Sequence, residues 1–451
     1  MEALRRSIYR EHLDEVSFFY EHRLMALEDP DFTLPEIAQL EGRCEAHLDG
    51  LVLGGEEARR LCKVRAGAGD FGELHGALRI FCRTDSPEEL VEVVAEADAS
   101  DAQYVAAVAD ALKYELPASW TDKVKTWLTA EDCPALLQAS LAVAAGYRGV
   151  SVVPELLVRV RSAKGPEVLP YLHALGQLRD PKAGMLFFRF MQQPEHDVGR
   201  AAAIAALRLQ GPDSNVRSHL HEAMSAFTWA PIPLALAADA YAAGPLLGLA
   251  HDNPSPDGLL ALGLLGDVSV LSSLLGFLSD AKLAESAALA LYLVTGADLP
   301  EVVEAPRERA EFEPDDSVDD EKEQQEEEPL LVTRLISQSP EQWKAWLSQH
   351  SGRFSKGKRY RLGEVYSPGG LVRGLTQHRL PLTVRRLLVD EIAIRYRVNA
   401  RYAPDMPAKE QLSAISSIGP TLVSVASHLR DLCWDVAIKD MTSGKEAREC
   451  P

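Results

Sequence analysis

The sequence predicts an all-α protein whose middle is a solenoid of stacked helix pairs. A short apolar phrase recurs between residues 133 and 296, and each copy ends at a residue that favours the end of a helix. The spacings between these stops are 33, 32, 33, 22 and 30 residues, which suits two short helices and two turns per repeat. No part of this region alternates apolar and polar residues as strands do. The predicted stops are Gly146, Arg179, Gly211, Gly244, Gly266 and Gly296.

The chain is expected to contain four parts. An N-terminal helical hairpin region precedes the repeat array, and a C-terminal helical module follows it. Between the array and this module the composition becomes strongly acidic. The predicted boundaries are 1–130 for the N-terminal region, 131–300 for the array, 301–330 for an acidic disordered linker or loop, and 331–451 for the basic C-terminal module.

The N-terminal region begins with one amphipathic helix, because apolar side chains in residues 1–27 recur at steps of three and four. Asp29-Pro30-Asp31 ends this helix, and Thr33 is a suitable cap for a second helix that runs to Leu51. The two helices predict a helical hairpin. Short helices are expected across residues 56–130, with Trp120 and Trp127 anchoring the junction with the array.

The array is expected to be stable only as a stack, because each helix pair is apolar on two sides. Alanine runs such as residues 201–206 allow neighbouring helices to approach closely. The turns at residues 196–200 and 212–217 resemble the Asp-x-x-Val-Arg turn of HEAT repeats, so the predicted fold is a HEAT-like α-solenoid. In that family the Asp and the Arg tie successive repeats together, which implies a structural role for Asp213 and Arg217.

An acidic segment follows the array. Residues 311–328 contain eleven acidic residues and one Lys, a composition too polar to order itself by burying apolar surface. Two hypotheses stay open for it: a solvated tether, or a segment that attracts a basic partner or masks the basic module. Its candidate partner-binding residues are Asp315, Asp316, Asp319 and Asp320.

The basic C-terminal module carries the opposite charge. From residue 353 to residue 401 there are twelve Lys and Arg against three acidic residues. These cations could contact phosphates, or they could be neutralised by the acidic segment or by a partner's carboxylates. We favour neutralisation, because the whole chain has a net charge of −20 and would oppose docking on nucleic acid. The candidate partner-binding residues here are Arg353, Lys356, Lys358, Arg359 and Arg361.

Helices are expected in the basic module at residues 341–346, 370–378, 382–397 and 420–438, followed by a polar tail.

No pattern of catalytic chemistry occurs in the sequence, which lacks a nucleophile–base motif, a Gly-rich phosphate loop and an H-E-x-x-H pattern. His12 and His22 point in different directions around a helix, and the Cys residues do not cluster with His. We therefore predict no catalytic, cofactor-binding or metal-binding residue. The six Cys fit reduced thiols, and no apolar run suits a signal peptide or a membrane span, so we expect a cytoplasmic protein.

Several motifs together resemble a proteobacterial family of uncharacterised HEAT-like repeat proteins that are often encoded among type VI secretion components. The resemblance covers nearly the full length and implies a role with secreted effectors or spike components. The motifs are Glu11-His-Leu-Asp-Glu-Val-Ser-Phe-Phe-Tyr-Glu-His22, Phe32-Thr-Leu34, Glu45-Ala-His-Leu-Asp-Gly-Leu51, Leu291-Tyr-Leu-Val-Thr-Gly-Ala-Asp-Leu299, Gly357-Lys-Arg-Tyr-Arg-Leu-Gly363 and Thr376-Gln-His-Arg379.

Two functions are compatible with these observations. The first is a non-enzymatic protein-binding scaffold that binds a cognate effector, as an immunity protein or a loading adaptor; a basic effector would suit the net charge of −20. The alternative is a HEAT-like nucleic-acid-binding or DNA-repair enzyme, which would need a basic concave face on the array. The array contains few Lys and Arg, so the sequence favours the scaffold and makes nucleic acid an improbable partner.

Overall fold

The computed structural model describes residues 2–212, 215–237, 242–305, 331–398 and 401–428. These residues form 22 α-helices and four short strands, which confirms the predicted all-α solenoid. The N-terminal helices are α1 (Glu2–Glu28), α2 (Leu34–Leu53), α3 (Gly55–Ala68), α4 (Phe71–Arg83), α5 (Pro87–Glu96), α6 (Ala102–Glu115) and α7 (Thr121–Thr129).

The array continues to α18 in further helix pairs. Its helices are α8 (Ala135–Arg148), α9 (Val153–Ser162), α10 (Leu169–Leu178), α11 (Gly184–Phe190), α12 (His196–Gln210), α13 (Asn215–Ala223), α14 (Pro231–Ala237), α15 (Ala243–Asp252), α16 (Pro256–Leu265), α17 (Leu271–Phe277) and α18 (Ala284–Thr295). The last elements are β1 (Pro300–Ala305), β2 (Leu331–Ile336), α19 (Pro340–His350), β3 (Tyr360–Arg361), β4 (Glu364–Val365), α20 (Pro368–Leu375), α21 (Leu382–Arg395) and α22 (Ala408–His428).

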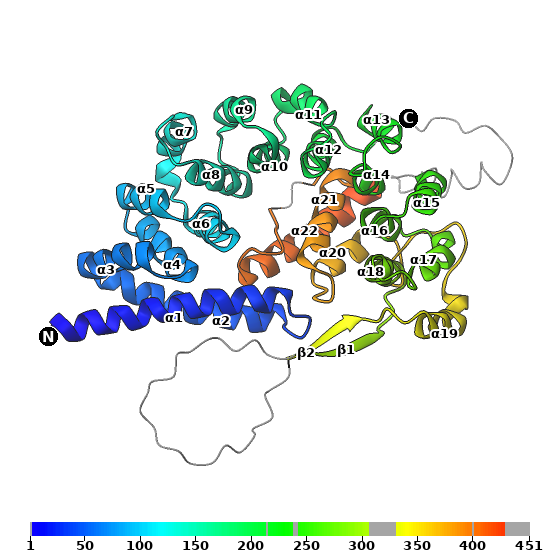
Figure 1. The fold of residues 1–451 in the computed structure, drawn as a ribbon, viewed down its shortest axis with the longest axis horizontal. Helices are drawn as coiled ribbons and strands as arrows, with labels where there is room; N and C mark the ends of the chain where they lie inside the picture. The colour runs from blue at the N-terminus through cyan, green and yellow to red at the C-terminus, as the bar shows by residue number, and fades with distance from the viewer. Residues whose placement is uncertain (1, 213–214, 238–241, 306–330, 399–400, 429–451) are drawn as a thin grey trace, which may run out of the picture.

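From α3 to α18 the helices alternate between the outer and inner layers of a curved array (Figure 1). The inner helices are the even-numbered ones, and each packs against the next inner helix. Because an outer helix runs back between each pair, all inner helices run in the same direction. Their N-termini therefore share one edge of the array, and their C-termini share the opposite edge.

The predicted stops are confirmed at four of six positions. Gly146 and Gly244 are wrong, because Gly146 lies inside α8, which ends just before Gly149, and Gly244 lies inside α15. The confirmed stops follow inner helices and have positive φ, a backbone conformation that favours glycine; they are Arg179, Gly211, Gly266 and Gly296.

The N-terminal hairpin is also confirmed. The backbone N–H and the hydroxyl of Thr33 donate to Glu36 Oε2 at 2.8 and 2.6 Å, so the predicted cap begins α2. Trp120 lies in a short 3-10 turn ahead of α7, not on the same helix as Trp127. The two rings still meet edge to face, with centroids 5.8 Å apart, at the junction with the array.

The turn at residues 196–200 joins repeats that are two apart, whereas the resemblance implies a link between successive repeats. Arg200 Nη2 lies 3.0 Å from Asp197 Oδ1, and Arg200 Nη1 lies 3.2 Å from Asp257 Oδ2. Arg200 therefore connects the N-termini of α12 and α16. Asp213 of the second turn lies outside the described residues, whereas Arg217 is part of α13.

None of the four short strands is predicted from the sequence. β1 and β2 pair antiparallel, with Val303 opposite Thr333 and Ala305 opposite Leu331. They flank the acidic segment. The predicted disordered linker at residues 301–330 is wrong for residues 301–305, which form most of β1, and its other residues lie outside the described part of the chain.

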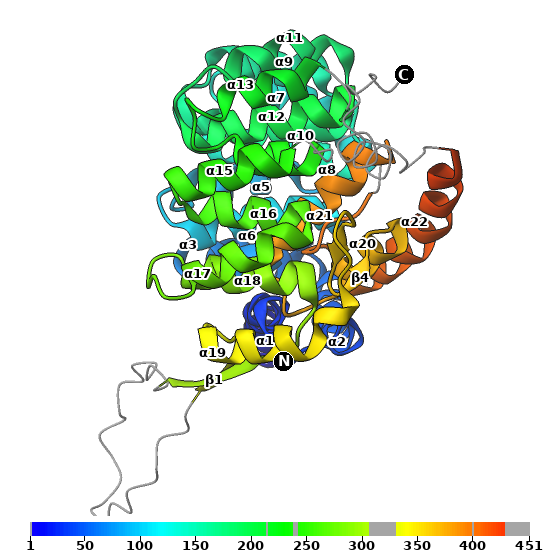
Figure 2. The same cartoon turned by 90° about the vertical axis from the view of Figure 1, so that its right-hand side faces the viewer.

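The C-terminal segment, defined here as residues 353–398 and 401–428, joins the two ends of the array. Its helices α20, α21 and α22 lie inside the arc in Figure 1 and along one edge of the array in Figure 2. α21 packs against α12 and α14, while α22 packs against α2. One hydrophobic core runs without interruption from Leu13 to Leu422, so the C-terminal segment is packed as part of the array.

The helix predictions for this part of the chain are confirmed for α19, α20 and α21, within a few residues at their ends. The last helix differs, because α22 begins at Ala408 and contains Pro420 in its interior, where the sequence analysis places a helix start. Residues after His428 lie outside the described range.

Small residues set the spacing between inner helices. A Cβ added to Gly263 in α16 would lie 2.6 Å from Ala290 Cα in α18, and a Cβ added to Gly176 in α10 would lie 2.8 Å from Ala205 Cβ in α12. Backbone atoms cannot move aside as flexible side chains can, so larger residues would force these helices apart.

We predict that Gly263→Ala lowers the free energy of unfolding by about 1–3 kcal/mol, because the added methyl group overpacks a helix contact. Gly248→Ala in the outer helix α15 is the matched control, since a Cβ there meets nothing within 4 Å. The control should leave stability unchanged or raise it by about 0.5–1 kcal/mol through helix propensity. Urea denaturation measures both, and equal effects would show that Gly263 does not set the helix spacing.

Candidate functional site

Arginines of the C-terminal segment cover the C-terminal end of α16. The last carbonyl groups of an α-helix have no partner within the helix. Arg359 Nε donates to Leu265 O at 2.7 Å, and Arg361 donates from Nη2 to Leu264 O at 2.6 Å and from Nη1 to Gly263 O at 3.2 Å. These two cations also interact favourably with the dipole of the helix.

The C-terminal segment also donates hydrogen bonds to the helices on either side of α16, which are α14 and α18. Arg395 Nη2 donates to Ala235 O of α14 at 3.4 Å, near the limit of a hydrogen bond. At the end of α18, the backbone N–H of Leu362 donates to Leu293 O at 2.7 Å. The C-terminal segment thus supplies both side-chain and main-chain donors to this edge.

Two further arginines join α10 and α12 to the end of α21. Arg397 Nη2 donates to Leu209 O of α12 at 2.8 Å. Arg179, which follows α10, donates from Nη2 to Ala393 O at 3.0 Å and to Val398 O at 3.1 Å. Burial first, and then the neighbouring Arg208 and Arg397, lower the pKa of Arg179 to about 10. Positive charge is therefore concentrated along the C-terminal edge.

Glu391 of α21 is the buried counter-charge of this cluster. Its Oε2 lies 2.9 Å from Arg361 Nη2, and its Oε1 lies 3.2 Å from both Arg359 Nη2 and Arg395 Nε. The Tyr366 hydroxyl donates to Oε1 at 2.7 Å. Burial alone would raise the pKa of Glu391, but the three arginines hold it below its ordinary value. Glu391 is thus an ionised carboxylate held inside the protein.

The structure corrects two of the predicted partner-binding residues. Arg359 and Arg361 are buried, at 6% and 1% exposure, and bind helix carbonyls and Glu391, so they are not available to an external partner. Arg353, Lys356 and Lys358 are exposed and stay candidates. The four predicted aspartates, Asp315, Asp316, Asp319 and Asp320, lie outside the described residues.

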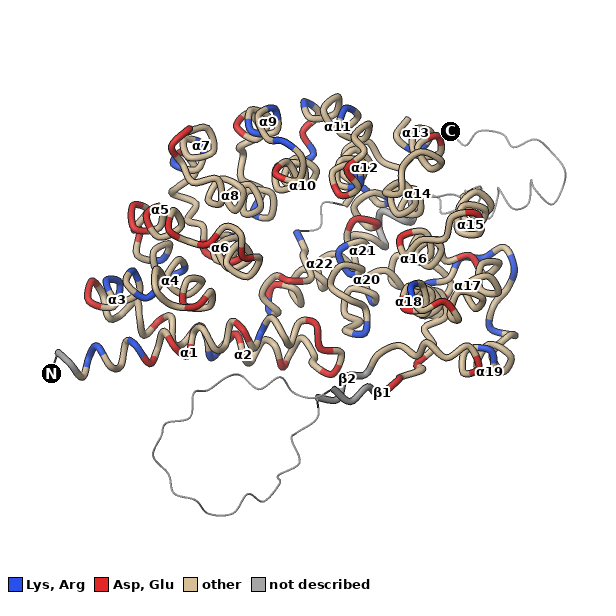
Figure 3. The backbone as a smooth tube through the Cα atoms, viewed as in Figure 1, with Lys and Arg blue, Asp and Glu red and all other residues tan. Residues whose placement is uncertain are grey.

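In Figure 3 the Lys and Arg of α20 and α21 lie inside the arc of the array. The sequence analysis misses Glu391 as a site residue. Its one sequence signal is the spacing of four residues to Arg395, which is typical of an ion pair on a helix.

Asp405 anchors the C-terminal segment to the N-terminal helices. Its Oδ2 lies 2.8 Å from Lys113 Nζ and 3.0 Å from Arg386 Nη2, and the Tyr114 hydroxyl donates to Asp405 O at 2.6 Å. Burial alone would raise the pKa of Asp405, but Lys113 and Arg386 hold it well below its ordinary value.

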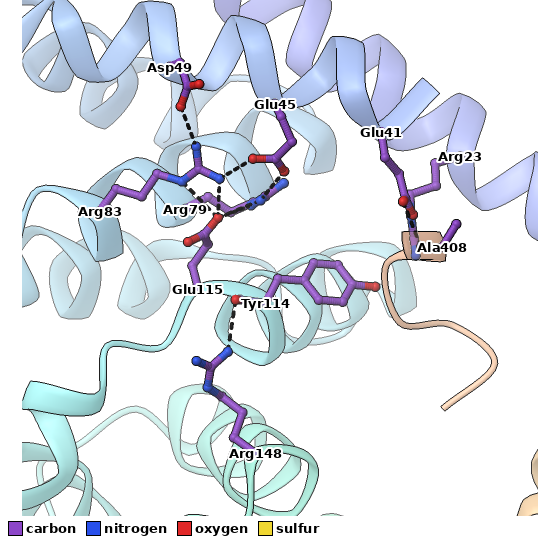
Figure 4. Close-up of polar contacts among 10 residues, drawn as sticks. All are labelled: Arg23, Glu41, Glu45, Asp49, Arg79, Arg83, Tyr114, Glu115, Arg148 and Ala408. Atoms are coloured by element: carbon purple, nitrogen blue, oxygen red, sulfur yellow. Dashed lines mark hydrogen bonds and ion pairs between the residues drawn. The ribbon is translucent and has the colours of Figure 1, made fainter. Parts of the chain in front are cut away.

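A second carboxylate, that of Glu41, binds the backbone at the start of α22, just after Asp405 (Figure 4). Glu41 of α2 accepts from Arg23 Nε at 2.7 Å and from the backbone N–H of Ala408 at 2.8 Å. Arg23 also donates from Nη2 to Asp405 O at 2.8 Å. The start of α22 is therefore held by charged groups of α1 and α2.

The rest of the network in Figure 4 ties α2, α4 and α6 together. Arg79 Nη2 lies 2.6 Å from both Glu45 Oε1 and Glu115 Oε1, and Arg83 Nη2 lies 2.5 Å from Glu45 Oε2. Arg83 also pairs with Glu115. Every group in this cluster has a partner within the chain, which indicates a structural role.

The N-terminal edge of the array has the opposite character. The eight connections that lead into inner helices, together with the first turn of each of those helices, contain twelve Asp and Glu and only two Lys. Several of these carboxylates cap helices, as Asp101 does when it accepts from Gln103 N at 2.7 Å. Others are exposed without a capping role, including Glu131 and Asp132 before α8. We call these turns the acidic edge; its charged residues are Asp70, Glu73, Asp98, Asp101, Glu131, Asp132, Lys164, Glu167, Glu195, Asp197, Asp257, Asp280, Lys282 and Glu285.

A groove of about 610 Å³ lies between the outer helices α5 and α7, with Val91 and Trp127 among its apolar lining residues. Its lining holds two carboxylates and one Lys: Glu88 lies 4.0 Å from Lys123, and Asp122 pairs at 2.9 Å with Lys125, which is outside the lining. The groove therefore favours neither acidic nor basic ligands.

Within the described residues, no group of three or more His, Cys, Asp and Glu is arranged to hold a metal ion. His12 and His47 do meet, with their Nδ1 atoms 3.1 Å apart. No helix among these described residues is both long enough and apolar enough to cross a membrane.

Comparisons with protein-family models, with curated proteins and with solved structures found no match to this chain.

We predict that Glu391→Gln lowers the free energy of unfolding by about 3–5 kcal/mol, because it leaves buried arginines without their counter-charge. Glu364→Gln is the matched control: Glu364 pairs with Arg373, but both side chains are more than half exposed, so the loss should stay below about 1 kcal/mol. Urea denaturation measures both variants. Similar losses would contradict a central role for Glu391.

His378 lies where the C-terminal segment meets the N-terminal hairpin. His378 lies near Arg385, Asp29 and Glu36, and Arg385 Nη2 donates to Leu27 O at 2.6 Å, at the end of α1. Burial first, and then Arg385, lower the pKa of His378 to about 4, while Asp29 and Glu36 act in the opposite direction.

Because the folded pKa of His378 lies below the unfolded value of about 6.5, the unfolded chain binds more protons between these pH values. The stability contributed by neutral His378 should be complete above about pH 6.5 and should fall as the pH approaches 4. We predict that His378→Gln loses less stability than the parent between pH 7 and pH 5, measured by urea midpoints. His251→Gln, at an exposed site, is the control and should follow the parent; parallel curves for all three would contradict the prediction.

Proposed function

We propose that this chain is a non-enzymatic protein-binding scaffold whose acidic edge docks a basic protein. The observation that carries this proposal is the difference between the two edges of the array. The C-terminal edge is bonded to the chain's own arginines, whereas exposed carboxylates line the N-terminal edge. Electrostatic complementarity of this kind chiefly speeds association and selects the partner.

The carboxylates of the acidic edge would act together. Individually, such residues stabilise the N-termini of helices by interacting with the helix dipole. Collectively, these connections and first turns hold ten more Asp and Glu than Lys. Arg200 pairs with Asp197 and Asp257, but the remaining excess creates a mainly negative field, which attracts a cationic surface. A basic partner would be attracted by this field while each carboxylate kept its contacts with its own helix.

The resemblance to a family encoded among type VI secretion components suggests what that partner is. We propose a cytoplasmic accessory protein that binds a cognate effector or a spike component before export. Both an immunity protein and a loading adaptor would use the same kind of surface, and a basic effector suits the net charge of −20.

A nucleic-acid-binding or DNA-repair enzyme has less support. Arginines that would contact phosphates on such a frame, including Arg359, Arg361 and Arg397, instead donate to helix carbonyls. Phosphate contacts need accessible cations, because affinity for nucleic acid arises from the release of counterions.

We predict that neutralising four exposed carboxylates of the acidic edge reduces capture of the native partner by about tenfold, because the attraction that guides docking is weakened. The substitutions are Asp98→Asn, Glu131→Gln, Asp132→Asn and Glu195→Gln. Tagged full-length chain is expressed in its native cell, and partners are recovered and quantified by mass spectrometry. Recovery by the parent should also fall as salt is raised.

The matched control changes the same net charge at carboxylates that already pair with a cation on their own side of the molecule. Its substitutions are Glu56→Gln, Glu88→Gln, Asp122→Asn and Glu364→Gln. The control should retain the partner. Equal losses in the two sets would show that total charge matters and the acidic edge does not; no protein partner for the parent would overturn the scaffold function itself.

A further inference from the structure

One face of α1 carries an exposed seam with the spacing of a coiled coil. Its positions alternate steps of four and three residues, as core positions of a two-stranded coiled coil do. Four of the seven are large apolar side chains that are 42–66% exposed: Leu4, Ile8, Phe18 and Met25. The seam consists of Leu4, Ile8, Glu11, Glu15, Phe18, His22 and Met25.

This seam lies where a solenoid is normally polar. The terminal helices of repeat arrays have no further repeat to cover them and usually carry a polar outer face. Here α1 lies at one end of the described array, and it packs on α2, α3 and α4 from its opposite side (Figure 1). Of the eleven large apolar side chains found exposed in the described chain, six lie on α1, α2 and α3. Exposed apolar surface is thus concentrated at this end.

Aromatic contacts extend the seam toward the turn after α1. The Phe18 and His22 ring centroids lie 5.7 Å apart, and those of His22 and Phe32 lie 5.9 Å apart. The aromatic side chains at this end of the seam therefore contact one another and form a continuous surface.

The two carboxylates in the middle of the seam exclude a second copy of the chain. In a parallel pair Glu11 would meet Glu11 and Glu15 would meet Glu15. In a fully overlapped antiparallel pair Glu15 would meet Glu15, and Glu11 would be buried against Phe18. Burying like charges in this way is strongly unfavourable. Polar residues at core positions of coiled coils select the partner in the same manner.

We propose that α1 packs one helix of a partner protein along this seam, and that the partner helix places Lys or Arg opposite Glu11 and Glu15 and apolar side chains opposite the remaining positions. At 27 residues, α1 is about 40 Å long, which is enough for a stable two-helix contact. The partner class agrees with the proposed scaffold function, but the seam uses no residue of the acidic edge.

The test uses the full chain and labelled synthetic helical peptides, with binding measured by fluorescence anisotropy. Each peptide has seven core positions, five of them Leu. In one peptide Lys occupies the third and fourth positions, which suits a parallel arrangement. In a second peptide Lys occupies the fourth and fifth, which suits an antiparallel one. Matched peptides carry Glu in place of Lys, and sedimentation confirms that each peptide is a monomer.

One Lys peptide should bind at least about tenfold more tightly than its Glu counterpart, a difference of 1.4 kcal/mol. The chain carrying Glu11→Lys and Glu15→Lys should reverse this preference. Phe18→Asp with Met25→Asp should weaken binding of the Lys peptide at least about tenfold. Val158→Asp with Met185→Asp, at exposed apolar sites on α9 and α11, should leave it unchanged.

Two outcomes would overturn the proposal. One is equal binding of the Lys and Glu peptides, or a preference that ignores the reversal of charge on α1. The other is self-association of the full chain that Phe18→Asp abolishes, which would make a second copy the occupant of the seam. Neither outcome bears on the acidic edge, whose test uses the native partner and an intact α1.

Discussion

The inner helices of this array all run in the same direction, so their C-termini lie along one edge. The rest of the structure depends on which groups bind the free carbonyl groups at that edge. Each helix leaves its last carbonyl groups without partners, and aligned dipoles make that edge electronegative. The chain meets this constraint with its own C-terminal segment: Arg359 and Arg361 bind the end of α16, and Arg397 binds the end of α12. The positive charge of the C-terminal region is therefore explained by the geometry of the array.

Binding helix ends with arginine brings cations into the interior, and buried cations need a counter-charge. Glu391 provides it for three arginines at once, and Asp405 provides it where Lys113 and Arg386 meet. Removing one member of such a group leaves the others desolvated and unpaired, so these clusters make the closed arrangement specific. The C-terminal segment consequently holds the hairpin and the far end of the array at a fixed distance, which suits a rigid scaffold.

The repeat stops could be predicted because the requirement is local. A residue that ends a helix in a left-handed conformation is most easily glycine, and Gly266 and Gly296 carry that signal themselves. Gly244 misleads because glycine is tolerated inside α15, where an added Cβ would meet nothing. The destination of Arg361 could not be predicted, because its acceptors are main-chain carbonyls about 100 residues earlier, and every helix end offers identical groups. The exposed seam of α1 is visible in the sequence as a heptad pattern, but only the packing of α2 and α4 shows which face is left open.

The same constraint determines which surfaces are available to a partner. Inner helices such as α10 and α12 contain 10 and 15 residues, so their two edges lie about 15–20 Å apart. The Debye length at physiological salt is about 8 Å, so salt largely screens the field of exposed arginines at one edge before it reaches a partner at the other edge. A partner approaching the N-terminal edge therefore meets a negative surface even though the nearby C-terminal segment is rich in arginine. Because the inner helices share one direction, carboxylates gather at their N-terminal edge and arginines at their C-terminal edge. The C-terminal segment covers the second edge, so the first edge is the one that a partner can reach.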